Sequence, residues 1–207
     1  MKRDLENFGV LITGGGTGIG KACAAEMYSH GAFVTICGRT EENLKQSVQE
    51  IVENHQDGGV IQYVTCDVTD EEQVLETVLA ADEFGEGLDG VVANAGGGGA
   101  IVPYHMQTAE EFSRVLNLNV LGTMLCIKHA VPILRKSDKA SFVGMSSIAS
   151  HLTHLWFGAY PAAKAGIEAI IRNAADEYGP ANIRFNAVRP GFICLLYTSD
   201  AADDSGC

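Results

Sequence analysis

The stretch Val10-Leu11-Ile12-Thr13-Gly14-Gly15-Gly16-Thr17-Gly18-Ile19-Gly20 decides the fold of this chain. A short apolar run enters a glycine-rich turn, and the stretch from Ile19 to Ser29 is then predicted to be a helix. Glycines let a backbone turn sharply and approach a pyrophosphate, which the free N–H groups of the helix N-terminus then hold. The order strand, turn, helix therefore favours phosphate or dinucleotide binding over a merely flexible turn. Gly20-Lys21-Ala22 lacks the hydroxyl residue of a P-loop, which disfavours a nucleoside triphosphatase.

Outward from this turn, the chain alternates predicted strands with predicted helices. The expected strands are Val10–Thr13, Phe33–Cys37, Ile61–Thr65, Gly90–Asn94, Ser141–Met145 and Arg184–Val188. Strands that alternate with helices of ten or more residues imply a parallel sheet that is covered on both faces. The sequence therefore predicts one α/β domain, a doubly wound Rossmann-type sheet.

Composition limits the classes of partner. The formal net charge of -12, with no basic stripe, excludes a nucleic-acid partner. The longest apolar runs are far too short to cross a bilayer, so no membrane partner is expected. The polar start of the chain shows no secretory signal. The six cysteines have neither metal-site nor disulfide-framework spacing, which predicts no metal site and a cytoplasmic location.

The end of the chain breaks the alternation of strands and helices. Residues 194–207 resemble the conceptual translation of a transposase-type sequencing-library adapter, and the alternative is a polar natural C-terminus. The adapter interpretation predicts a native domain over 1–193, truncated at its C-terminal end, followed by a non-native tail over 194–207.

A candidate for proton transfer lies in Tyr160-Pro161-Ala162-Ala163-Lys164. Residues four apart on a helix share one face, and a cation beside a phenol favours the phenolate. Tyr160 is therefore a candidate proton donor and acceptor. The pattern alone also occurs by chance on many helices.

Other motifs accompany this pair. They are Cys66-Asp67-Val68, Asn94-Ala95-Gly96, Asn119-Val120-Leu121-Gly122, Ser147 thirteen residues before Tyr160, and Arg189-Pro190-Gly191. Together with the turn Thr-Gly-x-x-x-Gly-x-Gly, they resemble the short-chain dehydrogenase/reductase family over residues of about 8 to 193. The resemblance implies a sheet that continues past Ile193 into substrate-covering helices and a last strand, which this chain lacks.

The resemblance also implies a site. Tyr160 would exchange a proton with the substrate oxygen, Ser147 would bind the same oxygen, and Lys164 would bind the nicotinamide ribose. Asn119 would keep a water against Lys164, which completes the catalytic set. The implied cofactor-binding residues are Gly14, Gly16, Thr17, Gly18, Ile19, Arg39, Asp67, Val68, Asn94, Ala95, Gly96, Tyr160, Lys164, Pro190 and Gly191.

Some of these assignments have competitors in the sequence. Ser146 competes with Ser147 and Asn117 with Asn119, and only motif spacing selects between them. The histidines and the tryptophan before Tyr160 are expected to line a substrate pocket rather than to act as bases. The glycine run 96–99 reads either as a mobile loop or as a slack connection.

Charge predicts which nicotinamide cofactor is used. An acid at the end of the second strand would bind the ribose hydroxyls and repel a 2′-phosphate, but this chain has Gly38 followed by Arg39. A guanidinium there pairs with a phosphate, which favours NADP(H) over NAD(H), although Glu41 and Glu42 mildly oppose it.

The sequence thus predicts an NADP(H)-dependent oxidoreductase acting on a small carbonyl or alcohol. The rival interpretation is a dinucleotide-binding protein without turnover, because its substrate-covering part is missing. The family resemblance implies a homodimer or homotetramer built on the helices of Asn119 and Tyr160.

Overall fold

A single parallel sheet forms the centre of the molecule. The computed structural model describes residues 4–193, and the adapter-like stretch and the expected junction at residue 194 lie outside them. Six strands pair in the order β3-β2-β1-β4-β5-β6, all parallel. Their bounds are β1 Gly9–Thr13, β2 Phe33–Gly38, β3 Val60–Thr65, β4 Gly90–Ala93, β5 Ser141–Met145 and β6 Arg184–Val188. The order reverses between β1 and β4, which opens a crevice at the carboxyl ends of these strands.

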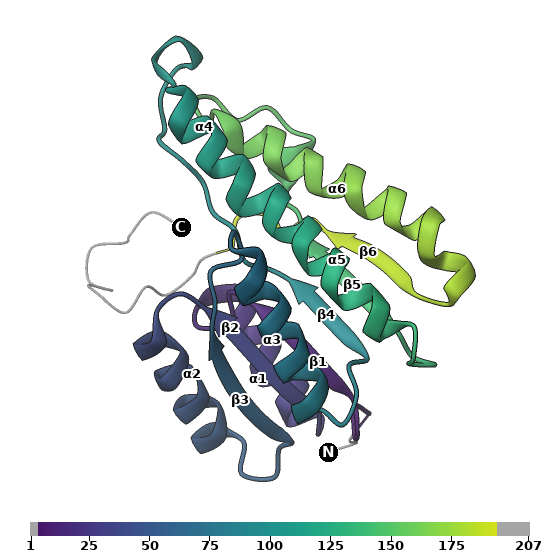
Figure 1. Cartoon of the computed structure of the whole chain (residues 1–207). Helices are drawn as coiled ribbons and strands as arrows, with labels where there is room; N and C mark the ends of the chain where they lie inside the picture. The colour runs from purple at the N-terminus through teal and green to yellow at the C-terminus, as the bar shows by residue number, and fades with distance from the viewer. Residues whose placement is uncertain (1–3, 194–207) are drawn as a thin grey trace.

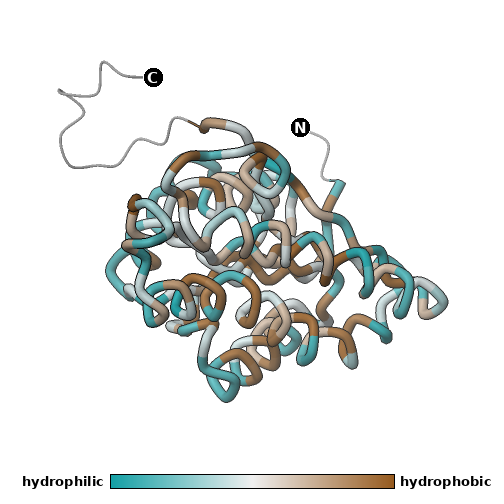
Figure 2. The backbone as a smooth tube through the Cα atoms, turned by 90° about the horizontal axis from the view of Figure 1, so that it is seen from above, coloured by the Kyte–Doolittle hydropathy of each residue, from teal (hydrophilic) through white to brown (hydrophobic). Residues whose placement is uncertain are grey.

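Helices cover both faces of the sheet, as predicted (Figure 1). The α-helices are α1 Gly18–Ser29, α2 Glu41–Asn54, α3 Glu71–Phe84, α4 Ala109–Leu116, α5 Gly122–Leu134 and α6 Ala159–Tyr178. Along β1, Val10 and Ile12 pack under α1 and α2, whereas Leu11 between them packs under α3, α5 and α6. Successive strand side chains alternate between faces, so an unbroken apolar strand builds two cores. Figure 2 shows the corresponding hydrophobic stretches in the interior.

Two further features of the helices position the site. A π-helical turn, Asn117–Leu121, joins α4 to α5 without a break. Asp70 caps α3 by accepting hydrogen bonds from the backbone N–H groups of Glu72 and Gln73, which fixes the segment that follows β3. Short 3-10 turns lie at Tyr104–Met106, Ile148–Ser150 and Gly179–Ala181.

One helical stretch is long and apolar enough to span a membrane by length and composition. Among the described residues it is Ala109–Leu134, which has a mean hydropathy of 1.2. It contains no uninterrupted apolar run of that length, and half of the apolar window is buried in the protein. A core helix of a soluble domain passes the same test, so the stretch is weak evidence for a membrane span.

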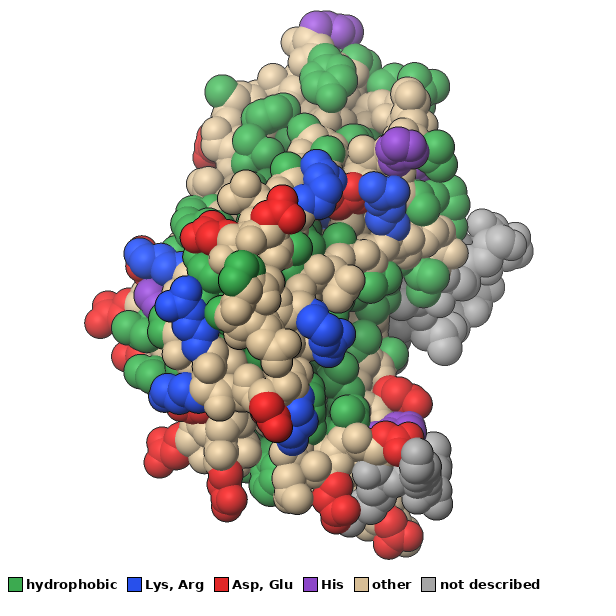
Figure 3. Space-filling model, turned by 90° about the vertical axis from the view of Figure 1, so that its right-hand side faces the viewer, with side chains coloured by type: hydrophobic (Ala, Val, Ile, Leu, Met, Phe, Trp, Pro, Cys, Tyr) green, Lys and Arg blue, Asp and Glu red, His purple; other side chains and the backbone are tan. Residues whose placement is uncertain are grey.

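The surface carries charges of both signs. On the face in Figure 3, basic and acidic side chains are interspersed. Ion pairs between described residues include Lys128–Glu71 and Lys139–Asp89.

Candidate active site

A cleft of about 540 Å³ opens at the carboxyl ends of the strands, beside the reversal between β1 and β4. It brings together residues that are up to 179 positions apart in the sequence, from Gly14 to Ile193. Ser147 and every residue that the sequence predicted to contact the cofactor line this cleft: Gly14, Gly16, Thr17, Gly18, Ile19, Arg39, Asp67, Val68, Asn94, Ala95, Gly96, Tyr160, Lys164, Pro190 and Gly191. Asn119 lies behind the wall, against Gly96 and Gly97.

The glycine turn has the geometry of a phosphate cradle. Gly14 adopts a φ of +66°, and a Cβ there would lie 2.9 Å from Nδ2 of Asn94. A Cβ on Gly20 would lie 2.3 Å from the carbonyl oxygen of Gly14. Asn94 fixes the turn by donating to the carbonyls of Thr13 and Gly14, at 3.0 and 3.2 Å. Thr17 gives α1 no side-chain cap, so the helix N-terminus presents its N–H groups to an anion. The cradle therefore fits a pyrophosphate.

The other end of the cleft lies against the loop that follows β3. The carboxylate of Asp67 accepts from the backbone N–H and the hydroxyl of Thr69, at 2.9 and 2.8 Å. Its backbone N–H donates to Oε1 of Gln73 at 2.9 Å, so the loop is rigidly held. Val68 packs so closely on α5 that a Cβ at Gly122 would lie 2.9 Å from its Cγ2. These contacts give the cleft a fixed wall at this end.

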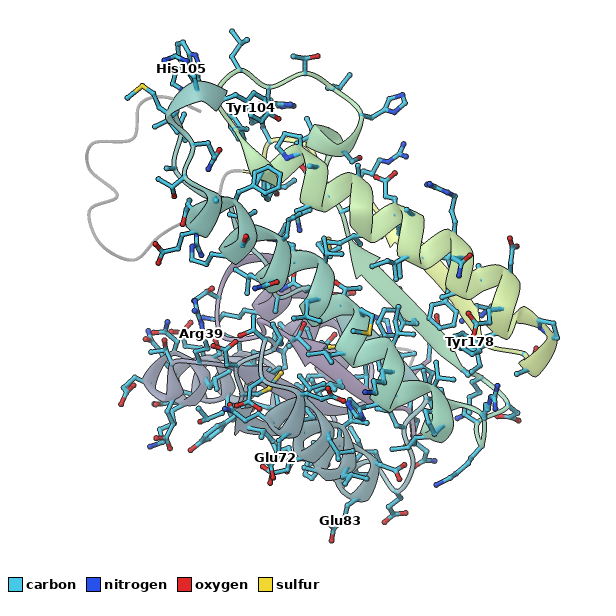
Figure 4. The ribbon with its side chains drawn as sticks, turned by 45° about the horizontal axis from the view of Figure 1, so that its top comes forward. Arg39, Glu72, Glu83, Tyr104, His105 and Tyr178 are labelled. Atoms are coloured by element: carbon cyan, nitrogen blue, oxygen red, sulfur yellow. The ribbon has the colours of Figure 1, made fainter. Side chains whose placement is uncertain are left out.

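Arg39 stands exposed at the N-terminal end of α2 (Figure 4). Within residues 4–193 its guanidinium has no hydrogen-bond or ion-pair partner. Glu41, by contrast, is paired with Lys45 at 2.9 Å and accepts from the hydroxyl of Tyr63 at 3.3 Å. The charge of Glu41 is thus partly neutralised, and Arg39 is left free to meet an anion.

Lys164 is buried beside Tyr160. Its side chain is 3% exposed, and Nζ donates to the carbonyl oxygen of Met145 at 2.8 Å. Nζ also lies 5.5 Å from the centroid of the Tyr160 ring. Burial lowers the pKa of Lys164 to about 8. The helix thus places an ammonium against a phenol at the mouth of the cleft, as the four-residue spacing predicted.

The amide of Asn119 clamps the start of the glycine run. Its Oδ1 accepts from Gly97 N–H at 3.2 Å, while its Nδ2 donates to the carbonyl oxygens of Gly97 and Val115, at 2.9 and 2.8 Å. A Cβ on Gly96 would lie 2.5 Å from Oδ1 of Asn119 and 3.2 Å from Nζ of Lys164. Only glycine lets the loop approach both groups. Asn117, the competitor, lines a separate hollow beside Arg39.

The rest of the glycine run is also held by side chains. Arg114 donates to the carbonyl oxygen of Gly98 at 3.2 Å, and Glu111 accepts from the N–H of Ala100 at 3.1 Å. Arg114 and Glu111 form an ion pair on α4, at 2.7 Å. These contacts tie Gly97, Gly98 and Ala100 to α4 and the π-helical turn, and they disfavour the interpretation as a slack connection.

The hydroxyls of the two adjacent serines, Ser146 and Ser147, lie in different surroundings. The Ser146 hydroxyl is buried and donates to Oε1 of Glu168 at 2.7 Å, with the Lys164 carbonyl oxygen 3.1 Å away. The Ser147 hydroxyl faces the cleft and accepts from the N–H of Ala149 at 3.1 Å. Its proton is therefore available for another acceptor. The geometry favours Ser147 over Ser146 as the group that meets a substrate.

Known proteins resemble this chain over nearly its whole length. The family model for short chain dehydrogenases matches residues 9–203. The chain is 36% identical over 184 residues to levodione reductase of Leifsonia aquatica, covering 89% of this chain and 68% of that protein. A short-chain type dehydrogenase/reductase from Mycobacterium ulcerans superposes with a TM-score of 0.90 at 40% identity, covering 92% of this chain and 70% of that one.

The chain belongs to the short-chain dehydrogenase/reductase family. Solved relatives carry either nicotinamide cofactor. Xylitol dehydrogenase was solved with NAD+ (TM-score 0.87, 29% identity, 91% of this chain and 72% of that one). A metagenomic short-chain oxidoreductase was solved with NADP (TM-score 0.83, 26% identity, 91% and 84%). The family therefore binds NAD(P), and the choice between the two rests on this chain's own residues.

In this short-chain dehydrogenase/reductase, the segment before Tyr160 forms an aromatic wall. The His154 ring lies 5.2 Å from the Phe157 ring and 5.9 Å from the Phe192 ring, and the Phe157 ring lies 6.3 Å from that of Tyr160. His151 and Trp156 are exposed, and Trp156 adopts a φ of +66°. The packing of His154 between two phenyl rings makes it part of an aromatic cluster, and the expectation that this segment lines a substrate pocket stays a prediction.

Sequence reasoning missed two features near the candidate site of this chain. The first is the π-helical turn at Asn119, where Thr123 donates to the displaced Asn119 carbonyl oxygen at 2.7 Å. Such turns occur mostly at functional sites, but no residue pattern announces them. The second is Glu168, which is 6% exposed and four residues after Lys164 on the same helix face. The four-residue spacing from Lys164 was the sequence signal that could have pointed to Glu168.

No metal centre accompanies these groups. Within the described part of the chain, no cluster of three or more His, Cys, Asp or Glu side chains is placed to hold a metal ion. The cysteines there are free thiols: Cys23, Cys37, Cys66 and Cys126.

Proposed function

We propose that this protein exchanges a hydride between NADP(H) and a carbonyl or alcohol substrate, with Tyr160 as the general acid and base. The observation that carries the proposal is the buried Lys164 ammonium, which lies 5.5 Å from the Tyr160 ring centroid in the cleft that also contains the glycine cradle. Ser147 opens onto the same cleft. A phenol, a cation and a hydroxyl beside a dinucleotide cradle are the groups that carbonyl reduction requires.

Each residue has a defined part in the proposed reaction. The Tyr160 hydroxyl donates its proton to the carbonyl oxygen and regains it in the reverse direction. The Ser147 hydroxyl donates a hydrogen bond to the same oxygen and holds it in place. The Lys164 ammonium stabilises the phenolate, and one of its three N–H donors is already fixed by Met145. The nicotinamide ring, when bound, supplies or accepts the hydride.

Asn119 supports these groups from behind the cleft. Its side-chain amide is engaged with Gly97 and Val115, so it holds the loop beside Lys164. The other two N–H donors of Lys164 remain for the nicotinamide ribose and for a water that links the proton path to solvent.

Arg39 supports NADP(H) as the cofactor. The unpaired guanidinium follows Gly38 at the end of β2, and both residues line the cleft. A free guanidinium pairs with the 2′-phosphate through two parallel hydrogen bonds. The Glu41 carboxylate that would repel this phosphate is occupied by Lys45.

The Tyr160→Phe variant tests the chemistry. Loss of the hydroxyl removes the proton donor, so we expect carbonyl-dependent NADPH oxidation to fall by about 10²–10⁴-fold. Binding of NADPH, measured by fluorescence titration, should change less than about twofold, since the phenyl ring remains. Full activity of Tyr160→Phe would remove Tyr160 from the mechanism. NADPH binding without turnover by the unaltered protein, over a panel of ketones and aldehydes, would favour the rival dinucleotide-binding function.

The same proposal includes self-association and a cytoplasmic location. An apolar groove runs between α5 and α6, and its floor is formed by Ile127, Val131, Ile170 and Ala174. Pairing of this groove with a second copy would give the expected homodimer, or a homotetramer with a further contact. A reducing cytoplasm suits the four free thiols of the described residues.

A further inference from the structure

A buried carboxylate joins four segments behind the candidate active site. Glu168 on α6 is 6% exposed, and its Oε1 accepts from the hydroxyls of Ser146 and Ser150 and from Nε of Arg189. Its Oε2 accepts from Nη2 of Arg189, so the guanidinium binds both carboxylate oxygens. Arg172, one turn further along α6, reaches the same carboxylate at 4.0 Å.

The partners of the Glu168 carboxylate lie on both sides of Ser147 in the chain. Ser146 precedes Ser147 at the end of β5, and Ser150 follows it on the 3-10 turn Ile148–Ser150. The Ser150 hydroxyl is also 2.7 Å from the carbonyl oxygen of Ser147. Glu168 therefore fixes the backbone on both sides of the catalytic candidate.

The cluster also fixes the segment that follows β6. Arg189 immediately precedes the Pro190–Gly191 wall of the cleft, and the Pro190 carbonyl oxygen accepts from the N–H of Ile148 at 3.0 Å. Arg189 holds this segment to α6 through Glu168. The Ser147 turn is thus held between α6 and the end of β6.

The carboxylate is charged in this setting. Hydrogen bonds from Arg189 first, and then from Ser150 and Ser146, lower the pKa of Glu168 to about 2 against the opposing effect of burial. A bidentate guanidinium–carboxylate pair adds geometric specificity as well as energy, and leaving a buried carboxylate without its partners is costly. Such a group is suited to fix neighbouring residues in position.

We propose that Glu168 is the positioning residue for Ser147, setting the direction of its hydroxyl relative to Tyr160 and Lys164 on the same helix. This inference rests on the proposed function. It assigns Glu168, Arg189, Ser146 and Ser150 to the site as support that contacts neither substrate nor cofactor. A purely structural carboxylate would affect folding but would not act through Ser147.

A double-mutant cycle between Glu168 and Ser147 tests the coupling. Glu168→Gln keeps the shape but weakens the pairing with Arg189, and we expect kcat for carbonyl reduction to fall about tenfold while KM for NADPH changes less than about twofold. In a Ser147→Ala background the same change should cost less than about twofold. Equal losses in both backgrounds would overturn the inference.

Two further variants keep the test sharp. Ser150→Ala removes one bond and retains the charge pair, so it folds even where Glu168→Gln does not, and its loss should also vanish in the Ser147→Ala background. Arg189→Lys should recover part of the activity lost in Arg189→Gln. Asp176→Asn, an exposed acid on the same helix, is the matched control and should leave kcat unchanged.

A measurement without turnover separates this inference from the proposed function. The Ala149 amide donates to Oγ of Ser147. The rate of hydrogen exchange at this amide therefore shows whether the Ser147 oxygen keeps its position. We expect Glu168→Gln to speed exchange at Ala149 by about tenfold more than at β1 amides. Unchanged protection at Ala149 would contradict the positioning role even if the protein proved to reduce no carbonyl.

Discussion

At the scale of single residues, the burial of the Lys164 ammonium makes the stability of the fold depend on pH. Its pKa is about 8, below the ordinary 10.5, because burial penalises the ammonium. Between these two pH values the unfolded chain binds more protons than the folded one. The free energy of unfolding therefore increases as the pH rises. Below about pH 8 the full penalty is present.

This linkage gives a prediction for Lys164→Met in the cofactor-free protein. Methionine has no charge to bury, so the stability of the variant relative to the unaltered protein should be greatest at pH 7. Its advantage should shrink by about 3 kcal/mol at most between pH 8 and 10.5, at about 1.4 kcal/mol per pKa unit. Urea unfolding of both proteins across this range measures the difference. The lost bond to Met145 adds a constant offset, so a pH-independent difference would contradict the prediction.

In the proposed function, the preference for NADP(H) rests on one side chain, that of Arg39. We expect Arg39→Ala to raise KM for NADPH by about 10–100-fold, because a bidentate charged contact with the 2′-phosphate is lost. KM for NADH, which has no such phosphate, should change less than about threefold. The ratio of kcat/KM for the two cofactors measures this selectivity. Lys136→Ala, an exposed cation remote from the cleft, is the control. Equal losses with both cofactors would show that Arg39 acts only through local structure.

At the scale of elements, the strands were predictable to within about one residue at each end. Buried parallel strands read as short apolar runs, and glycine turns bound them. That the predicted cofactor-binding residues would gather in one cleft was likewise predictable, because most of them follow strand ends at one edge of the sheet; their contact with a cofactor stays a prediction. The π-helical turn was not, since it depends on Thr123 and on the loop at Gly97, which lies on a different element. The hydrogen-bond partners of Glu168, which are Ser146, Ser150 and Arg189, lie 18 to 22 residues away, so no local pattern could name them.

The contact between the glycine run and the π-helical turn gives an element-scale prediction. A Cβ at Gly96 would meet Asn119 at 2.5 Å, whereas one at Gly98 would meet nothing within 4 Å. Gly96→Ala should therefore displace the loop from Lys164, destabilise the protein by about 1–3 kcal/mol and lower kcat by at least about tenfold. Gly98→Ala, two residues away in the same run, should be nearly neutral. Thermal unfolding and NADPH-dependent reduction measure both variants, and similar behaviour of the two alanines would contradict the proposed contact.

At the scale of the whole molecule, the sheet brings two groups of candidate site residues together at the reversal of strand order between β1 and β4. The strands on one side bring the glycine cradle and Arg39, and those on the other side bring Ser147 and the Pro190 segment. Tyr160, Lys164 and Glu168 all lie on α6, so the position of this helix relative to the sheet sets where the three side chains stand in the candidate site. Anything that buttresses α6 from outside would therefore support the site.

The groove between α5 and α6 is the surface where such support is expected. Ala169 lines this groove and is exposed, so Ala169→Arg places a large charge there without emptying the core. If two copies pair through the groove, sedimentation velocity should show a dimer or tetramer for the unaltered protein and a monomer for Ala169→Arg. Activity should then fall at low protein concentration, because α6 loses its outer contact. Gln49→Arg, on α2 of the opposite face, is the matched control and should sediment like the unaltered protein. A monomeric unaltered protein, or an unchanged oligomer in Ala169→Arg, would exclude this groove as the interface.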